Sequence, residues 1–165
     1  MPHRAFIGIG SNLGDRKANH IDAWDRIGKL PATRIVKASS LYESEPHGDA
    51  KTWFVNAVIE IETESSADEL LKRLKVIEKV MGRKRVKGKR WGSRVIDLDI
   101  LMFDNEVVNK RTLRIPHKEL PNRRFVLVPM CELAPQMVHP ALSATISELL
   151  SASKDKKKVH LMPRS

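Results

Sequence analysis

The stretch VIDLDILMF, residues 95–103, constrains the fold of this chain more than any other segment. Acidic and large apolar residues alternate through it, and a period of two is typical of a β-strand with one buried face. In a strand, Asp97 and Asp99 project from the same face, roughly 6.5–7 Å apart along the chain. The opposite, apolar face is predicted to carry Ile96, Leu98, Ile100 and Met102. The pattern predicts a sheet whose apolar face packs against helices and whose other face presents two carboxylates.

Three further segments are predicted to be strands, at residues 5–9, 34–43 and 53–61. The last alternates most clearly, with Phe54 and Asn56 on one face and small or aliphatic residues on the other.

Two helices are expected between these strands. The first begins at an N-cap, either Asn12 or Asp15, and ends at Pro31. Its apolar residues recur at helical spacing and comprise Ile21, Trp24, Ile27 and Leu30.

The second helix is predicted by a capping pattern, Ser66 with Glu69, followed by an apolar stripe and a terminal Gly82. The stripe comprises Leu70, Leu74, Ile77 and Met81. The order β-α-β-β-α-β is that of a ferredoxin-like α+β fold, an antiparallel sheet with helices on one face. A C-terminal arm follows, with a small hairpin over 105–115 and short helices over 124–133 and 144–151.

Length and composition restrict the class of protein. A chain of 165 residues is expected to form one domain, 1–165, with a basic and partly disordered tail over 151–165. The single cysteine, Cys131, excludes an internal disulfide framework and suits a reducing cytosol. The N-terminus lacks the features of a signal peptide, and no apolar segment approaches the roughly 20 residues of a membrane helix. We therefore expect a soluble cytoplasmic protein without a membrane partner.

The positive charge is concentrated in two places. The formal net charge is +10, and residues 83–94 alone contain seven Lys or Arg and no acid. The tail over 151–165 is also basic, which leaves the rest of the chain close to neutral. A focused patch of this kind attracts an anionic ligand, either a nucleotide or RNA.

The two aspartates and the basic segment before them suggest phosphoryl-transfer chemistry. Two carboxylates at i and i+2 can hold one or two hard cations, and Mg²⁺ takes its other ligands from water and substrate phosphates. Arginines bind phosphate through two parallel hydrogen bonds. The glycine-punctuated segment 82–94 is expected to be mobile when empty and to order around a polyphosphate. The alternatives are a pair of solvated acids on an open sheet face and a solvated or RNA-binding charge run.

Other side chains suit a flat heterocycle and phosphate. Phe54 can stack on a ring while Asn56, on the same strand face, hydrogen-bonds its edge. His117, in the segment IPHKELPNRRF, is expected to be exposed and close to phosphate, with Arg123 as a further phosphate contact and Phe125 as a second aromatic wall. Taken alone, each of these residues is more often structural.

Four motifs in order resemble the 6-hydroxymethyl-7,8-dihydropterin pyrophosphokinase family. The most specific is RWGSRVIDLDIL; the others are IGSNLGDR, WFVNAV and NEVVN…IPH…NRRF. The resemblance runs from about residue 4 to about residue 150. It implies transfer of pyrophosphate from ATP to the hydroxymethyl group of the dihydropterin, with release of AMP, in folate biosynthesis. It also implies a ferredoxin-like fold.

The resemblance implies roles for individual residues. Asp97 and Asp99 look like the ligands of two Mg²⁺ ions, and the catalytic set would be Arg83, Arg94, Asp97 and Asp99. The ATP-binding set would be Glu78, Arg85, Trp91, Ile100, His117 and Arg123. The pterin-binding set would be Ser44, His47, Phe54, Asn56 and Phe125. The expected partners are ATP and 6-hydroxymethyl-7,8-dihydropterin, without nucleic acid, and the expected state is a monomer.

Two positions depart from the family pattern beside the pterin site. Glu45 stands where a small apolar residue or proline is common, and Lys51 stands where glutamine is usual. In the arm, Thr112 and Arg114 appear in the reverse order of some relatives. The rival function is an RNA-binding module, which would need several stacking aromatics on the open sheet face in place of two carboxylates. A third hypothesis is a catalytically silent member of the family with a regulatory role.

Overall fold

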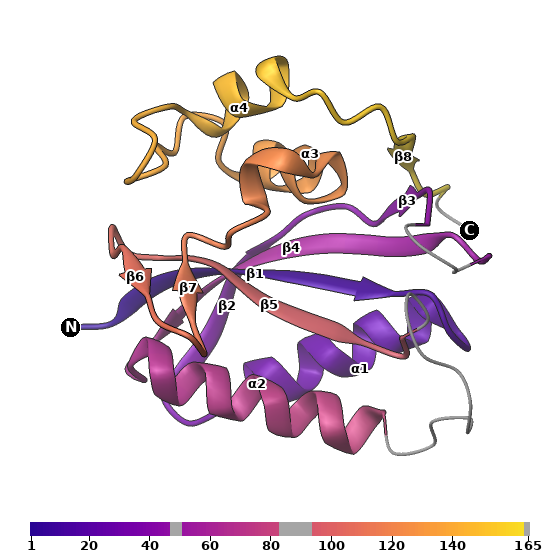
Figure 1. The fold of residues 1–165 in the computed structure, drawn as a ribbon. Helices are drawn as coiled ribbons and strands as arrows, with labels where there is room; N and C mark the ends of the chain where they lie inside the picture. Colours follow the sequence, from indigo (N-terminus) through magenta and orange to yellow (C-terminus); the bar gives the residue numbers. More distant parts are fainter. Residues whose placement is uncertain (47–50, 83–93, 164–165) are drawn as a thin grey trace.

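The fold is an antiparallel six-stranded sheet covered by helices on both faces, as the ribbon shows (Figure 1). The structure is a computed structural model that describes residues 1–46, 51–82 and 94–163. In spatial order the strands are β5 (Asp97–Phe103), β1 (His3–Ser11), β4 (Phe54–Thr63), β3 (Tyr42–Ser44) and β8 (Val159–Leu161), and β2 (Thr33–Ala38) also pairs with β4. The central order β5-β1-β4-β3, with every pair antiparallel, confirms the ferredoxin-like prediction.

Helices α1 (Arg16–Gly28) and α2 (Ala67–Met81) cover the lower face of the sheet in Figure 1. Asp15 is the N-cap of α1, where its side chain accepts the N–H of Ala18 at 3.0 Å. The helix buries His20, Ala23 and Ile27. The prediction that Ile21 belongs to the apolar stripe was wrong, because its side chain is 62% exposed.

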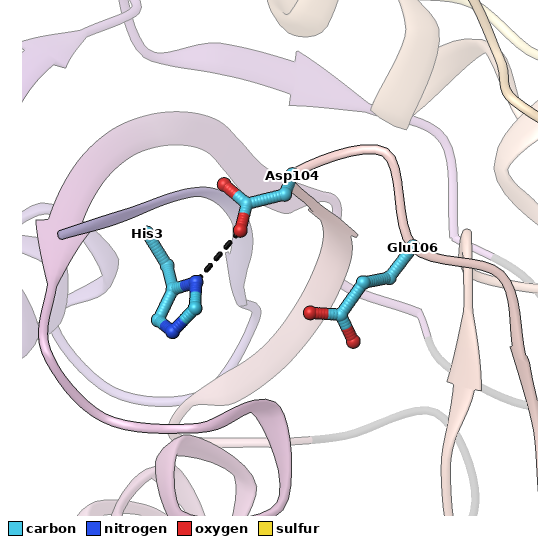
Figure 2. A group of neighbouring side chains, drawn as sticks. All are labelled: His3, Asp104 and Glu106. Carbon is cyan, nitrogen blue, oxygen red and sulfur yellow. Dashed lines mark hydrogen bonds and ion pairs between the residues drawn. The ribbon is translucent and has the colours of Figure 1, made fainter. Parts of the chain in front are cut away.

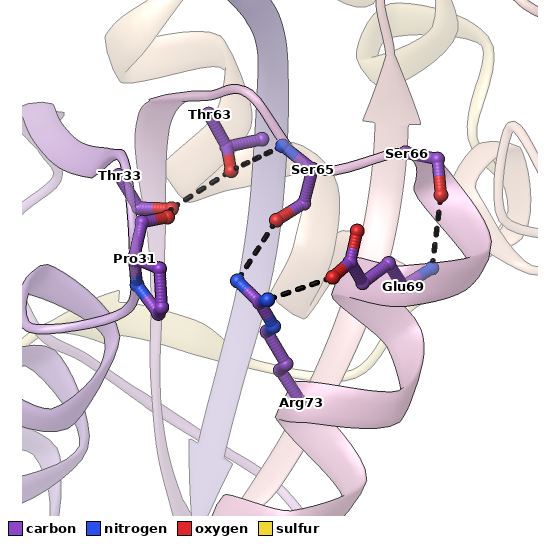
Figure 3. Close-up of polar contacts among 7 residues, drawn as sticks. All are labelled: Pro31, Thr33, Thr63, Ser65, Ser66, Glu69 and Arg73. Atoms are coloured by element: carbon purple, nitrogen blue, oxygen red, sulfur yellow. Dashed lines mark hydrogen bonds and ion pairs between the residues drawn. The ribbon is translucent and has the colours of Figure 1, made fainter.

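The start of α2 is fixed by polar contacts that Figure 3 shows. Ser66 caps the helix by accepting the N–H of Glu69 at 3.2 Å, as the capping pattern predicted. Arg73, one turn further on, donates to Glu69 at 2.7 Å and to the Ser65 hydroxyl at 3.1 Å. The predicted apolar stripe packs in the main core, and Gly82 ends the helix. These contacts tie α2 to the end of β4.

Strand β5 contains a β-bulge that the sequence pattern did not predict. Ile100 pairs with Ile7 and Met102 pairs with Phe6, so Leu101 is an extra residue in β5. An extra residue reverses the facing of all that follow it. Met102 therefore packs in the cluster above the sheet, and its predicted position beside Ile96, Leu98 and Ile100 was wrong.

A second core lies on the face that carries the aspartates. Helices α3 (Arg124–Leu133) and α4 (Ile146–Ala152) pack above the sheet, α3 directly against β4 and α4 against α3. The core includes Phe6, Val58, Leu101, Met102, Leu127 and Met130. Both helices were predicted from the sequence, but the prediction that helices cover one face of the sheet only was wrong. The helical cover begins at Arg124. The C-terminal end of β1 and the N-terminal ends of β4 and β5 lie beside that point.

Short elements complete the chain. A hairpin of β6 (Val108–Asn109) and β7 (Arg114–Ile115) confirms the predicted arm, and a 3₁₀ turn η1 (Leu120–Asn122) leads into α3. The predicted strand 34–43 is divided into β2 and β3, and β8 in the basic tail was not predicted. Within the described residues, no helix is both long and apolar enough to cross a membrane.

Candidate active site

A pocket of about 150 Å³ opens where β5, β1 and β4 meet the N-terminus of α3. Asp97 and Asp99 of β5 lie on one side of it, and Phe54 and Asn56 of β4 lie on the other. Gly8 and Gly10 of β1 separate the two strands. The other predicted site residues in the lining are Ser44, His117, Arg123 and Phe125. The structure thus brings most of the predicted site residues that it describes into one cavity.

The two carboxylates share the face predicted from their spacing. Asp97 pairs with Gly10 and Asp99 with Gly8, so neither acid has a side chain beside it on β1. Burial and the negative charge of Asp97 raise the pKa of Asp99 to about 6, although the positive charges of Lys75, Arg123 and Arg94 oppose the shift. An acid whose charged form is disfavoured in this way is stabilised by a bound cation. The donor set, two carboxylates with no third acid in the pocket lining, suits Mg²⁺ that completes its shell with water and phosphate.

Glu78 supports the same strand from the opposite side of the sheet. Its Oε2 accepts the backbone N–H of Leu98, the residue between the two aspartates, at 2.8 Å. Burial raises the pKa of Glu78, whereas the hydrogen bond from Leu98 lowers it. The residue is absent from the pocket lining. The structure therefore supports a role in positioning the strand, and direct contact with ATP stays a prediction.

Arg94 is anchored through its backbone by Asn12, at the end of β1. Arg94 donates its N–H to Asn12 Oδ1 at 2.6 Å, and the N–H of Asn12 donates to the Arg94 carbonyl at 3.0 Å. The Asn12 amide also donates to the carbonyl of Thr52 at 3.3 Å. Sequence reasoning considered Asn12 only as a helix cap. Its asparagine carboxamide, able to donate and accept at once, is the signal that was missed.

His117 is half-buried rather than exposed as predicted. Its Nδ1 accepts the N–H of Glu119 at 3.1 Å, and its Nε2 lies 3.8 Å from Asp99 Oδ1. Burial and the charge of Arg123 lower the pKa of His117. The neutral ring therefore carries its proton on Nε2, which faces the aspartate side of the pocket. A histidine in this state donates one hydrogen bond.

The opposite side of the pocket presents the carboxamide of Asn56 beside the ring of Phe54. The hydroxyl of Ser44 donates to Oδ1 of Asn56, which leaves the Asn56 Nδ2 group as a donor. Gly10 lies against this group: a Cβ at position 10 would stand 2.9 Å from Asn56 Nδ2 and 3.6 Å from Phe54. Arg123 lies over the Phe125 ring, 5.6 Å from its centroid. This side suits a flat, polar heterocycle.

Some predicted residues stand apart from this pocket. The side chain of Ile100 is buried in the core on the other face of the sheet, so only its backbone is available to a nucleotide. Arg83, Arg85, Trp91 and His47 lie outside the described residues. Their roles stay predictions.

A separate group of potential metal ligands lies at the other end of β5: His3, Asp104 and Glu106 (Figure 2). Their ligand atoms lie within 4.8 Å of one another. His3 Nδ1 is 2.7 Å from Asp104 Oδ2, and Asp104 Oδ1 accepts the N–H of Arg4 at 2.8 Å. Both Asp104 oxygens are thus used to join the ends of β1 and β5, and Glu106 is exposed. We interpret this group as a structural contact.

Comparison with known proteins identifies a family that this chain matches over most of its length. Residues 6–135 match the family described as 7,8-dihydro-6-hydroxymethylpterin-pyrophosphokinase. A protein of Haemophilus influenzae named 2-amino-4-hydroxy-6-hydroxymethyldihydropteridine pyrophosphokinase is 42% identical over 160 residues, 96% of this chain and 98% of that protein. A protein of Methylorubrum extorquens with the same name is 40% identical over 136 residues, 82% of this chain and 85% of that protein.

Solved structures show the same fold. The crystal structure of an HPPK-DHPS protein in complex with substrates matches with a TM-score of 0.73 at 14% sequence identity. The match covers 92% of this chain and 43% of that longer chain. At this identity the likeness concerns the fold alone.

Proposed function

The chain belongs to the 7,8-dihydro-6-hydroxymethylpterin-pyrophosphokinase family, and on that premise we propose that the pocket between β5 and β4 is its active site. The enzyme transfers pyrophosphate from ATP to the hydroxymethyl group of 6-hydroxymethyl-7,8-dihydropterin in folate biosynthesis and releases AMP. The observation that supports the location best is the pair Asp97 and Asp99, open in one cavity together with Arg123, His117 and Asn56.

Asp97 and Asp99 hold two Mg²⁺ ions in this proposal. Their fit rests on the shared strand face, on the two glycines opposite them and on the raised pKa of Asp99. When bound, Mg²⁺ neutralises phosphate charge and orients the transferring group. The protein contributes the rigidity of the site, because β5 is paired along its length with β1 and is held from below by Glu78.

Arg94, Arg123 and His117 contact the phosphates. The two arginines supply positive charge that stabilises the negative pyrophosphoryl group during transfer. The two carboxylates, which are themselves negative, cannot do this without bound cations. His117 adds a neutral donor through Nε2, because its Nδ1 is occupied by Glu119. Arg83 and Arg85, which we also assign to phosphate, lie outside the described residues, as does Trp91.

The pterin lies between Phe54 and Phe125, with its polar edge on Asn56. Ser44 holds the Asn56 carboxamide in one orientation, so its Nδ2 donors face the ring. The nucleophile is the substrate hydroxyl and the electrophile is the β-phosphorus of ATP. No protein nucleophile is required, and catalysis comes from alignment of the two substrates and from charge stabilisation.

The decisive experiment measures AMP formation from ATP by the purified enzyme. AMP is expected only when Mg²⁺ and the dihydropterin alcohol are both present, and the dihydropterin diphosphate should appear in equal amount. AMP release without the pterin, or no release with it, would overturn the assignment. Family membership favours this reaction over RNA binding. The monomeric state and the cytoplasmic location stay predictions.

A further inference from the structure

The C-terminal segment, residues 155–162, runs along the pterin side of the pocket rather than away from the fold. Its strand β8 pairs antiparallel with β3, so that Val159 lies opposite Ser44. Ser44 in turn lies opposite Phe54 on β4 and holds Asn56. In Figure 1 the yellow arrow of β8 lies beside β3 at the edge of the sheet. Two β-pairings therefore connect the tail to the residues assigned to the pterin.

Glu45 makes a reciprocal contact with the tail just past the end of β3. The N–H of Glu45 donates to the Lys158 carbonyl at 3.0 Å, and the N–H of Lys158 donates to Glu45 Oε1 at 2.6 Å. A hydrogen bond to a carboxylate is stronger than one between neutral groups. The residue that departs from the family pattern beside the pterin site thus has a partner in the tail.

Two further contacts hold the segment on either side of this one. His160 packs on Trp53, the neighbour of Phe54, with ring centroids 5.2 Å apart. At the other end, Asp155 Oδ2 accepts the N–H of Arg124 at 2.9 Å, at the N-terminus of α3. Arg124 is followed by Phe125 and has no cap from its own preceding residue, since Arg123 makes no side-chain cap bond. A carboxylate at a helix N-terminus is stabilising, so the tail supplies the cap that α3 lacks.

We propose that the C-terminal segment is a positioning element for the pterin subsite, with Glu45 and Asp155 as its two anchors. Glu45 fixes the segment against β3 and thereby Ser44 and Asn56, whereas Asp155 fixes the start of α3 and thereby Phe125. Strand β8 contacts β3 and α3, whereas the aspartates lie on β5, at the other end of the strand order. The element acts chiefly on pterin binding, with a smaller effect on ATP through Asp155, because Asp155 accepts a bond at the start of α3, whose N-cap is Arg123. This inference rests on the proposed assignment of the pterin residues.

The test compares Glu45→Ala, Asp155→Ala and the double variant with the wild-type enzyme. Glu45→Ala should raise KM for the pterin by roughly tenfold while KM for ATP stays within about twofold, since sub-ångström displacement of binding groups has effects of this size. Asp155→Ala should raise KM for the pterin by a similar factor and KM for ATP by a smaller one, because Asp155 also adjoins Arg123. The double variant should show a larger rise. Glu45→Gln retains an acceptor for the Lys158 N–H and should restore most of the affinity. Lys156→Ala, an exposed tail residue, is the matched control for a changed charge.

Other outcomes overturn the proposal. Equal rises in both KM values, or loss of activity only through a lowered unfolding temperature, would show that the contacts serve general stability. Unchanged pterin KM in both single variants and in the double variant would show that the segment has no role. Phe54→Ala and Asn56→Ala test the subsite itself: if they leave pterin KM unchanged, the proposed pocket is wrong, independently of the tail.

Discussion

Glu78, on α2, accepts the backbone N–H of Leu98 in the edge strand β5, at 2.8 Å from nitrogen to Oε2. Leu98 lies between Asp97 and Asp99, so this bond holds the peptide units that carry both acids. The helix below the sheet is thereby connected to the chemistry above it. Groups that orient metal ligands commonly contribute 10–100-fold to affinity or rate.

Replacing Glu78 tests this connection. Glu78→Leu should lower kcat and the apparent affinity for Mg²⁺ by about 10–100-fold, because the Leu98 N–H loses its acceptor and β5 is free to shift. Glu78→Gln keeps a carbonyl oxygen in place and should retain most of the activity. Steady-state kinetics over a Mg²⁺ titration measure both variants. Wild-type kinetics in the leucine variant would show that β1 alone holds the strand.

The carboxylates themselves should be far more sensitive. Asp97→Ala and Asp99→Ala should each lower the rate of AMP formation by several orders of magnitude, since each removes charge at the proposed metal site. Asp25→Ala removes an acid from a surface pair with Lys29 on α1 and is the matched control, with near-normal turnover expected. Near-normal turnover in either pocket variant would exclude the metal role.

Gly10 should be intolerant of even one methyl group. In Gly10→Ala the new Cβ would stand 2.9 Å from Asn56 Nδ2, too close for a methyl carbon against a nitrogen, so the carboxamide must move. We expect KM for the pterin to rise by roughly tenfold or more. Gly28→Ala, at the end of α1, places its Cβ 3.7 Å from Ile35 and is the control, with unchanged kinetics expected. Equal behaviour of the two variants would contradict the role of Gly10.

Asn12 should control the placement of Arg94. Asn12→Leu removes the acceptor of the Arg94 N–H and the donor to the Thr52 carbonyl, two contacts that join the segments before β5 and before β4. Because the Arg94 side chain is expected to act on the transferring group, kcat should fall more than KM rises. Asn12→Asp keeps the acceptor alone and should be intermediate. A change confined to the unfolding temperature would argue for a structural role only.

Stability should depend on pH through His20. Its Nε2 donates to the Val55 carbonyl at 2.7 Å, and burial lowers its pKa to about 4. The unfolded chain takes up the proton near pH 6.5 but the folded protein only near pH 4, so the unfolded state binds more protons between these values. The free energy of unfolding should therefore decrease as the pH falls from 6.5 to 4, by about 3 kcal/mol. Urea unfolding of the wild type and of His20→Gln across this range measures the difference, and parallel pH profiles would contradict it.

The local patterns of the sequence predicted the fold well. Alternation identified β4 and the first half of β5, and the capping residues Asp15 and Ser66 start α1 and α2 where they were expected. These features depend on neighbours within a few residues of the chain, which a sequence displays directly. The same alternation predicted the shared faces of Asp97 with Asp99 and of Phe54 with Asn56, and all four line the pocket. Ser44 was expected only from the family resemblance.

Contacts between distant segments were not predictable in this way. Nothing local indicates that Glu78 bonds to Leu98, that Asn12 bonds to Arg94 or that the basic tail forms β8, because each depends on how separate elements pack. The basic run near Lys158 resembles a disordered tail in composition. Its backbone nevertheless pairs with β3 at the edge of the sheet. The lysine side chains give no indication of this pairing in the sequence.

The extra residue at Leu101 also limits how this enzyme can be redesigned. Before Leu101, the alternation of side chains along β5 points Asp97 and Asp99 into the pocket. After Leu101 the alternation is reversed, so Met102 lies above the sheet and Phe103 below it. If Leu101 were deleted, only one half of β5 could keep both its pairing with β1 and the present direction of its side chains. A graft of this site onto another scaffold must carry residues 97–103 together with their partner strand, as one indivisible cassette.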